Sequence, residues 1–89
     1  MEAIEFVEFI RGKKCVVCFE NAEPDHLNAI GMGRNRKKPD LEEHYSCVPL
    51  CRMHHTKRHS IGIEAFNIFY KVNLWKENRD YLLEYFTKM

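Results

Sequence analysis

The sequence predicts a small α+β domain that is stabilised by zinc and carries helices at both ends. Two observations favour this fold class: metal-ligand residues in two separate clusters, and apolar residues at helical spacing near both termini. The 89 residues fit one domain, residues 1–89, with a small hydrophobic core. A metal site is therefore a physically useful addition to the stability of this chain.

The first half of the chain predicts one helix, two short extended segments and a long loop. Five apolar residues recur at helical spacing near the N-terminus: Ile4, Phe6, Val7, Phe9 and Ile10. They predict an amphipathic helix that ends near Gly12. Residues 13–19 are expected to form a short strand or the start of a metal-binding knuckle, and residues 24–27 a second short strand. Residues 31–46 lack periodicity and predict a long loop.

The second half of the chain predicts helices. Residues 48–50 lead into Cys51, and a helix is expected over residues 52–59, with Gly62 as its stop. One or two further helices are indicated by apolar residues at helical spacing: Phe66, Phe69, Tyr70, Trp75, Tyr81, Leu82, Tyr85 and Phe86. These side chains are expected in the core; the alternative is a dimer interface or a surface for a larger protein.

Charge and cysteine usage limit the class of protein. The net charge of +1 says nothing about partners, but seven basic and three acidic residues lie between Arg34 and His59. That patch is either a solvated surface or a contact for a phosphate-bearing polymer. The acidic N-terminus lacks an apolar run, and no segment could span a membrane, so a cytoplasmic protein is expected. Its thiols then serve as metal ligands rather than disulfides, and Cys47 is left as a buried apolar residue.

Residues 51–59 hold more metal ligands than one tetrahedral ion can use. Positions three or four apart share one face of an α-helix, so Cys51 pairs with His54, and His55 pairs with His59. The competing partition joins Cys51 to His55 and leaves His54 and His59 five positions apart, about 140° apart around the helix. One ion could hardly take both of those histidines.

Two pairs of residues earlier in the chain complete the two sets of metal ligands, one set for each pair on the helix. Cys15 and Cys18, with the C-x-x-C spacing, complete a Cys₃His structural zinc site with Cys51 and His54. The second set needs an oxygen ligand and a reacting group, and Asp25-His26 can supply both. Adjacent strand residues point to opposite faces, so Asp25 can bind metal while His26 addresses a substrate, given some local distortion.

Together these motifs resemble the HNH endonucleases, also called ββα-metal or His-Me finger nucleases, and in particular small phage and prophage members. The resemblance covers about residues 6–70. It depends on Cys15-x-x-Cys18, Asp25-His26, Gly31-Met32-Gly33-Arg34, Lys38-Pro39-Asp40, Val48-Pro49-Leu50-Cys51-Arg52-x-His54-His55-x-x-x-His59, and Gly62. It implies a zinc-stabilised ββα-metal finger with flanking N- and C-terminal helices.

The resemblance also implies roles for the second set. His26 matches the general base that activates water for attack on a backbone phosphate. Asp25, His55 and His59 match the ligands of one divalent ion, expected to be Mg²⁺ or Mn²⁺, with Zn²⁺ or Ni²⁺ as further candidates. Contacts to flanking phosphates are expected from four basic residues: Arg34, Arg36, Lys37 and Lys38.

The function expected from the resemblance is a metal-dependent DNA endonuclease that nicks double-stranded DNA and leaves a 5′ phosphate and a 3′ hydroxyl. Low intrinsic sequence specificity is expected, and a homodimer or a phage protein partner is left open. The alternative is a non-catalytic zinc module that binds DNA or supports a phage complex. One departure from the family pattern is the asparagine expected shortly before the helix: Ser46 lies near that place, and Asp40 or His44 could compensate.

Overall fold

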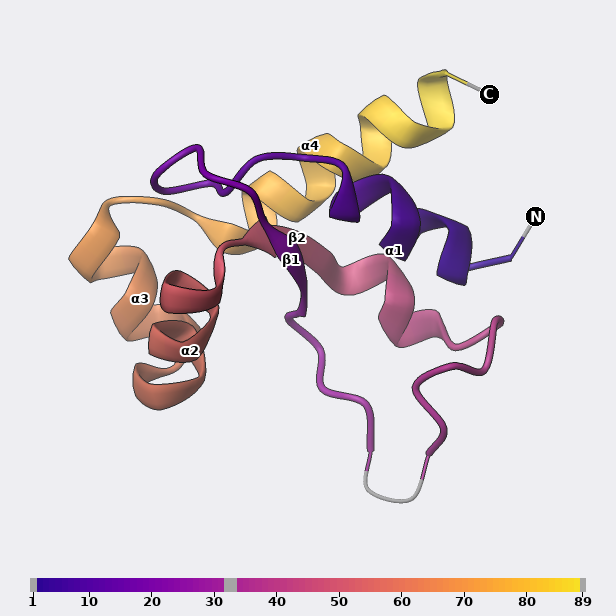
Figure 1. The fold of residues 1–89 in the computed structure, drawn as a ribbon, viewed down its shortest axis with the longest axis horizontal. Coiled ribbons are helices and arrows are strands. Elements are labelled where there is room, and N and C mark those ends of the chain that lie inside the picture. The colour runs from indigo at the N-terminus through magenta and orange to yellow at the C-terminus, as the bar shows by residue number, and fades with distance from the viewer. Residues whose placement is uncertain (1, 32–33, 89) are drawn as a thin grey trace.

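A computed structural model describes residues 2–31 and 34–88, so Met32 and Gly33 of the expected loop motif lie outside the described residues. The elements along the chain are helix α1 (Ile4–Arg11), strand β1 (Glu23–His26), 3₁₀ helix η1 (Glu42–Ser46), strand β2 (Cys47–Leu50), and helices α2 (Arg52–Ile61), α3 (Ile63–Tyr70) and α4 (Leu74–Thr87) (Figure 1). The predicted α+β class is confirmed.

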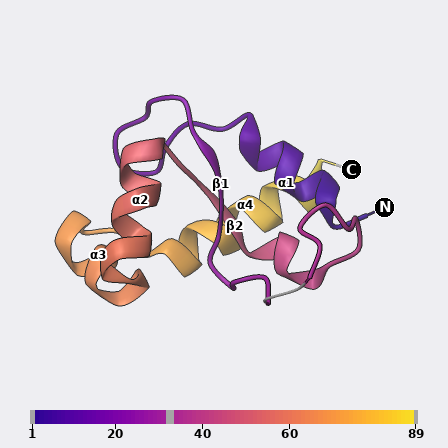
Figure 2. The same ribbon diagram turned by 60° about the horizontal axis from the view of Figure 1, so that its bottom comes forward.

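The two strands pair in antiparallel fashion at the centre of the molecule. His26 lies opposite Cys47, and Glu23 opposite Leu50. Helix α2 follows β2 directly, so β1, β2 and α2 form the ββα unit that the resemblance implies. The strand pair lies between α2 and α3 on one side and α1 on the other (Figure 2). This arrangement presents one end of β1 to the first two turns of α2.

Two small apolar clusters meet along β2, whose four residues are all buried. One cluster joins β2 to the C-terminal helices and contains Cys15, Leu27, Val48, Leu50, Phe66 and Leu74. The other lies between α1 and α4 and contains Phe6, Val7, Ile10 and Cys47. Cys47 is fully buried, as its expected apolar role requires. Neither cluster is large, so a bound metal ion would add usefully to the stability of this fold.

Several expected boundaries change in the structure. Residues 13–19 form the knuckle rather than a strand, because only an isolated bridge joins Lys14 to Asn21. The expected loop 31–46 ends in η1. Helix α2 runs two residues past its expected end and stops at Gly62, whose φ of 86° lies in the region that favours glycine. No helix in the described residues is long and apolar enough to span a bilayer.

The C-terminal aromatic residues are less buried than the expected core role requires. Phe66 of α3 is fully buried in the cluster that contains Leu50 and Leu74. Phe69, Trp75 and Phe86 are 67%, 47% and 49% exposed, so the core interpretation is wrong for these three. Their spacing is helical, but α3 and α4 each have an apolar stripe wider than the face that the small domain can cover.

Candidate functional site

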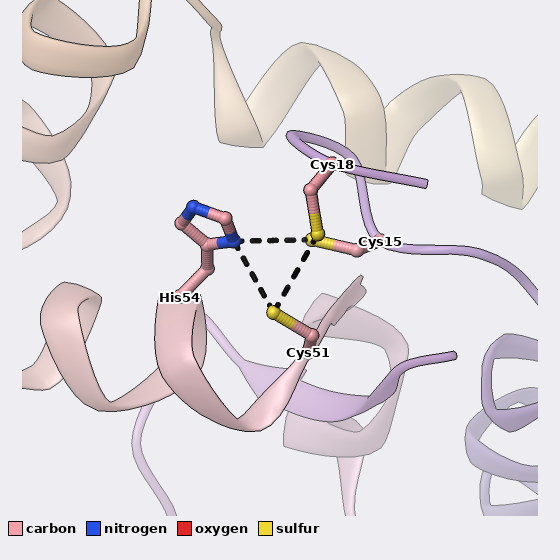
Figure 3. Close-up of side chains that lie close together, drawn as sticks. All are labelled: Cys15, Cys18, Cys51 and His54. Atoms are coloured by element: carbon pink, nitrogen blue, oxygen red, sulfur yellow. Dashed lines mark hydrogen bonds between the residues drawn. The ribbon is translucent and has the colours of Figure 1, made fainter. Parts of the chain in front are cut away.

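The first candidate metal centre is formed by Cys15, Cys18, Cys51 and His54 (Figure 3). The two upstream cysteines come from the knuckle that follows α1, whereas Cys51 and His54 lie at the start of α2. The four donor atoms all lie within 4.8 Å of one another. Helix geometry and the C-x-x-C spacing therefore grouped these four side chains as the structure does.

The distances between the donor atoms fit a tetrahedral ion. The Sγ atoms of Cys18 and Cys51 are 3.7 Å apart, and Nδ1 of His54 is 3.6 Å from Sγ of Cys15 and 3.2 Å from Sγ of Cys51. A tetrahedral zinc site has sulfur–sulfur edges of about 3.8 Å and sulfur–nitrogen edges of about 3.6 Å. This donor set could therefore hold a metal ion such as zinc.

The backbone of the knuckle is arranged for thiolate ligands. The N–H of Cys15 donates to the carbonyl of Glu20, and the N–H of Val16 donates to the carbonyl of Pro49, which ties the knuckle to β2. Burial raises the pKa of Cys15, but backbone N–H groups that include those of Cys51 and Cys18 outweigh it, and the net pKa is lowered. A thiolate is the form that binds metal.

The second candidate centre is formed by Asp25 from β1 and by His55 and His59 from α2. Oδ1 of Asp25 lies 3.2 Å from Nε2 of His55 and 3.6 Å from Nε2 of His59, and the two Nε2 atoms are 3.0 Å apart. Adjacent ligands of an octahedral ion lie about 3.0 Å apart when each bond is about 2.1 Å. The three donors thus fit one divalent ion.

Glu23 orients His55 toward this centre. Its Oε1 atom lies 2.7 Å from Nδ1 of His55, which leaves Nε2 directed at Asp25. Hydrogen bonds to Asp25 first, and to Glu23 second, raise the pKa of His55 above its ordinary value despite burial. The two carboxylates therefore favour a cation at this point. A carboxylate behind a histidine ligand is a common way to fix its tautomer and ring orientation.

Arg58 holds the carboxylate of Asp25 from the other side. Its Nε donates to Oδ2 at 2.7 Å and its Nη2 donates to Oδ1, while Asp25 is fully buried. Burial raises the pKa of Asp25, but the hydrogen bonds from His55 and Arg58 outweigh it and lower the pKa below its usual value. Burial and the positive charge of Arg58 lower the pKa of His59, which keeps a lone pair available.

His26 lies at the end of β1, beside the second centre. It lines a pocket of about 100 Å³ together with Asp25, His55, His59 and Arg36. Its Nε2 atom is 3.0 Å from Nδ1 of His44 on η1. Burial first, and then the electrostatic influence of the neighbouring His44 and Arg36, lower the pKa of His26 to about 4. Its imidazole is therefore neutral, and able to accept a proton, across the physiological range.

A larger hollow of about 520 Å³ adjoins this pocket on the side of α1. Its basic lining residues are Arg11, Arg36, Lys37 and Arg52, and Arg36 borders both hollows. Arg34 instead forms an ion pair with the buried Glu43, with Nη1 and Oε2 2.6 Å apart. Lys38 is exposed, and its carbonyl lies 2.8 Å from Nε2 of His44. The four expected phosphate contacts thus fall into different environments.

Comparison with protein families gives a match over residues 2–83 to the family described as "Putative HNHc nuclease". The chain belongs to this HNH family. The resemblance noted in the sequence over residues 6–70 is thereby confirmed. Comparison with curated proteins and with solved structures finds no match.

The asparagine that the HNH pattern places shortly before the helix has no counterpart among residues 47–51 of this chain. Ser46, near the position of the expected asparagine, accepts from the N–H of Asn28 at 3.0 Å and donates to the carbonyl of Glu43 at 2.6 Å. An asparagine does bind this loop, but it comes from α4. Nδ2 of Asn78 donates to the carbonyls of Tyr45 and Cys47 at 2.8 Å and 3.0 Å.

Two residues of the site, Glu23 and Arg58, were not found from the sequence of this HNH chain, and His44 was named there only as a possible substitute for the missing asparagine. The period of two along a strand could have indicated Glu23, since it shares a face with Asp25. Arg58 follows His55 by three positions, so helix geometry could have indicated that it lies on the same side of α2 as His55. His44 carries no such local signal, because it reaches the site only where η1 folds back beside the end of β1.

Proposed function

We propose that this chain is a metal-dependent DNA endonuclease that hydrolyses one phosphodiester bond and leaves a 5′ phosphate and a 3′ hydroxyl. The observation that carries the proposal is the convergence of His26 with Asp25, His55 and His59 on one small pocket. Membership of the HNH family supports a nuclease with a nucleic-acid substrate. The resemblance to small phage members extends the proposal to a phage or prophage context.

Asp25, His55 and His59 would hold a divalent ion, and we favour Mg²⁺ or Mn²⁺, with Zn²⁺ or Ni²⁺ as further candidates. Such an ion, when bound, supplies Lewis-acid stabilisation of charge on the phosphate and on the leaving 3′ oxygen. The protein contributes the orientation of the three donors. Glu23 fixes the ring of His55, and Arg58 fixes the carboxylate of Asp25, so little reorganisation is needed.

His26 is the general base of the proposed reaction. Its neutral imidazole accepts a proton from a water molecule while the water oxygen forms a bond to phosphorus. The bond from phosphorus to the 3′ oxygen breaks on the opposite side, and that oxygen leaves with the bonding electrons and takes a proton from water to become the 3′ hydroxyl. The lowered pKa of His26, about 4, keeps the base unprotonated at neutral pH, although it also makes the base a weak one.

The nucleic-acid strand is proposed to lie along the two adjoining hollows. Arg36 borders both of them, and Lys37 and Arg52 line the larger one, so their charges can neutralise phosphates on one side of the scissile bond. Lys38 is exposed next to them. Arg34 is a weaker candidate than expected, because Glu43 already holds its guanidinium. Contacts of this kind position a strand without reading its sequence.

The Cys15, Cys18, Cys51 and His54 centre is proposed to hold structural zinc. Both upstream cysteines belong to the knuckle between α1 and β1, whereas Cys51 and His54 begin α2. Zinc bound here fixes the start of α2 relative to β1. That constraint holds His55 and His59, one to two turns later, against Asp25.

Nicking of supercoiled plasmid across a series of divalent ions tests the proposal. We expect ion-dependent nicking by the parent, and a loss of about 100-fold or more in His26→Gln, the usual contribution of a general base. Glu64→Gln, an exposed substitution on α3, is the control and should keep the parent's rate. Parental nicking by a folded His26→Gln protein overturns the role of His26. DNA binding without nicking by the parent indicates the non-catalytic zinc module instead.

A further inference from the structure

We propose that His44 is a positioning residue that sets the tautomer and the ring orientation of His26, so that Nδ1 of His26 is the nitrogen that takes the proton. This inference rests on the proposed function, in which His26 is the general base. His44 belongs to neither of the candidate metal sets. It acts only through the ring of His26.

The hydrogen-bond chain through His44 determines where the hydrogens lie. Nε2 of His44 is 2.8 Å from the carbonyl oxygen of Lys38, and a carbonyl can only accept, so this nitrogen carries the hydrogen. In a neutral imidazole the other nitrogen, Nδ1, is then an acceptor. Nε2 of His26, 3.0 Å from that acceptor, must donate. The neutral ring of His26 therefore keeps its lone pair on Nδ1.

No competing contact is present for that lone pair. Within residues 2–31 and 34–88, Nδ1 of His26 has no hydrogen-bond partner in the structure, whereas Nε2 is held by His44. His26 also lines the 100 Å³ pocket with Asp25, His55 and His59. The free nitrogen thus belongs to the ring that borders the candidate centre, which is the arrangement that a general base requires.

The segment that carries His44 is itself held firmly. His44 is 1% exposed, and the carbonyls that flank it in η1 are bound by Ser46 and Asn78. The β1–β2 register places His26 opposite Cys47, directly after η1. The position of His44 is therefore set by the fold rather than by the substrate. A preorganised orienting group costs no reordering when the reaction begins.

A purely structural role for His44 makes a different prediction, because its bond to the Lys38 carbonyl alone could anchor the loop. Two substitutions separate the roles. His44→Asn keeps an acceptor oxygen near the position of Nδ1 but does not reach Lys38. His44→Gln places its amide near the position of Nε2 and keeps the donor to Lys38, but it offers His26 no acceptor.

Nicking kinetics of the two variants give the first test. We expect His44→Asn to keep kcat within about tenfold of the parent, and His44→Gln to lose more than about tenfold in kcat with KM unchanged, because an unoriented base fails only in the chemical step. The reverse order, with His44→Gln active and His44→Asn impaired, overturns the proposal. It would show that the anchor to Lys38 is the function of His44.

The second test does not depend on activity. Histidine nitrogen and carbon chemical shifts, measured by NMR on the zinc-loaded protein without added divalent ion at neutral pH, report the tautomer of each ring. We expect His26 as the Nε2–H tautomer in the parent and in His44→Asn, and a mixture of tautomers in His44→Gln. An Nδ1–H tautomer in the parent overturns the proposal even where His44→Gln fails to fold. Absence of nicking by the parent, with the expected tautomer present, refutes only the proposed nuclease function.

Discussion

Arg58 and Asp25 form a bidentate ion pair that joins α2 to β1 within the interior. Nε of Arg58 donates to Oδ2 of Asp25 at 2.7 Å, and Nη2 donates both to Oδ1 and, at 3.2 Å, to the carbonyl of His26. The same Oδ1 faces His55 and His59. The guanidinium therefore offsets the desolvation of a fully buried carboxylate and fixes the direction of its remaining lone pair.

Removal of Arg58 should leave Asp25 buried without its charge partner. We expect Arg58→Ala to lower the free energy of unfolding by about 3–5 kcal/mol, the usual cost of breaking a buried pair from one side. Arg52→Ala is a matched control on the same helix, because Arg52 is 84% exposed and its ion pair with Glu23 should contribute below about 1 kcal/mol. Urea unfolding measures both. Equal losses in the two variants would show that the Arg58 pair does not stabilise the fold.

Cys15 and Cys47 are both fully buried, but only Cys15 should be needed for zinc binding. Cys15→Ala removes a proposed ligand, so we expect loss of bound zinc and of the cooperative unfolding transition, because metal binding here contributes folding free energy. Cys47→Ala removes an equally buried thiol outside the cluster and should keep one zinc per chain, at a cost of about 1 kcal/mol. Metal content and thermal unfolding measure the difference. Stoichiometric zinc in Cys15→Ala, with the parent's melting temperature, contradicts this assignment.

The parts of the site that the sequence predicted are those that local geometry determines. Helical spacing separated Cys51 and His54 from His55 and His59, and the structure keeps these pairs apart in two clusters. The ββα order and the N-terminal helix follow from patterns of a few residues. Such patterns need no knowledge of how distant segments meet.

The parts that were missed depend on long-range contacts. Arg34 and Arg58 looked like members of one basic patch, but each is held by a carboxylate, Glu43 for the first and Asp25 for the second. His44 reaches His26 only because η1 folds back beside the end of β1. Charge patterning along a chain cannot separate a basic residue that neutralises a buried acid from one that is free for a phosphate.

The free energy of unfolding should decrease as the pH is lowered, because His26 titrates. Its pKa in the folded protein, about 4, lies below its ordinary value of 6.5, so between these values the unfolded chain binds a proton that the folded chain does not. The contribution is complete above pH 6.5 and is lost as the pH falls toward 4, by about 1–3 kcal/mol. Urea unfolding of the parent and of His26→Gln across this range measures it, since zinc ligation affects both alike. A difference between the two proteins that does not change with pH contradicts the prediction.

Glu23 should affect metal affinity more than stability. Glu23→Gln removes the negative charge next to Nδ1 of His55. We therefore expect the affinity of the Asp25 centre for Mn²⁺ to fall by about 10- to 100-fold. Calorimetric titration of the zinc-loaded protein measures this affinity without substrate. Glu64→Gln makes the same chemical change on the exposed face of α3 and should leave the affinity unaltered. Equal affinity in both variants would show that Glu23 does not support the metal ligand.

Arg36 should contribute to nucleic-acid binding through phosphate neutralisation. We expect Arg36→Gln to reduce the slope of log affinity against log salt by about 0.9, the value for one phosphate contact on a duplex. Fluorescence anisotropy with duplexes of several sequences measures this, in a His26→Gln background so that the strands stay intact. Arg79→Gln removes the same charge from the exposed face of α4 and should leave the slope unchanged. A smaller slope in both variants would indicate a general charge effect, whereas a change for Arg36 alone, uniform across sequences, identifies a phosphate contact beside the proposed scissile bond.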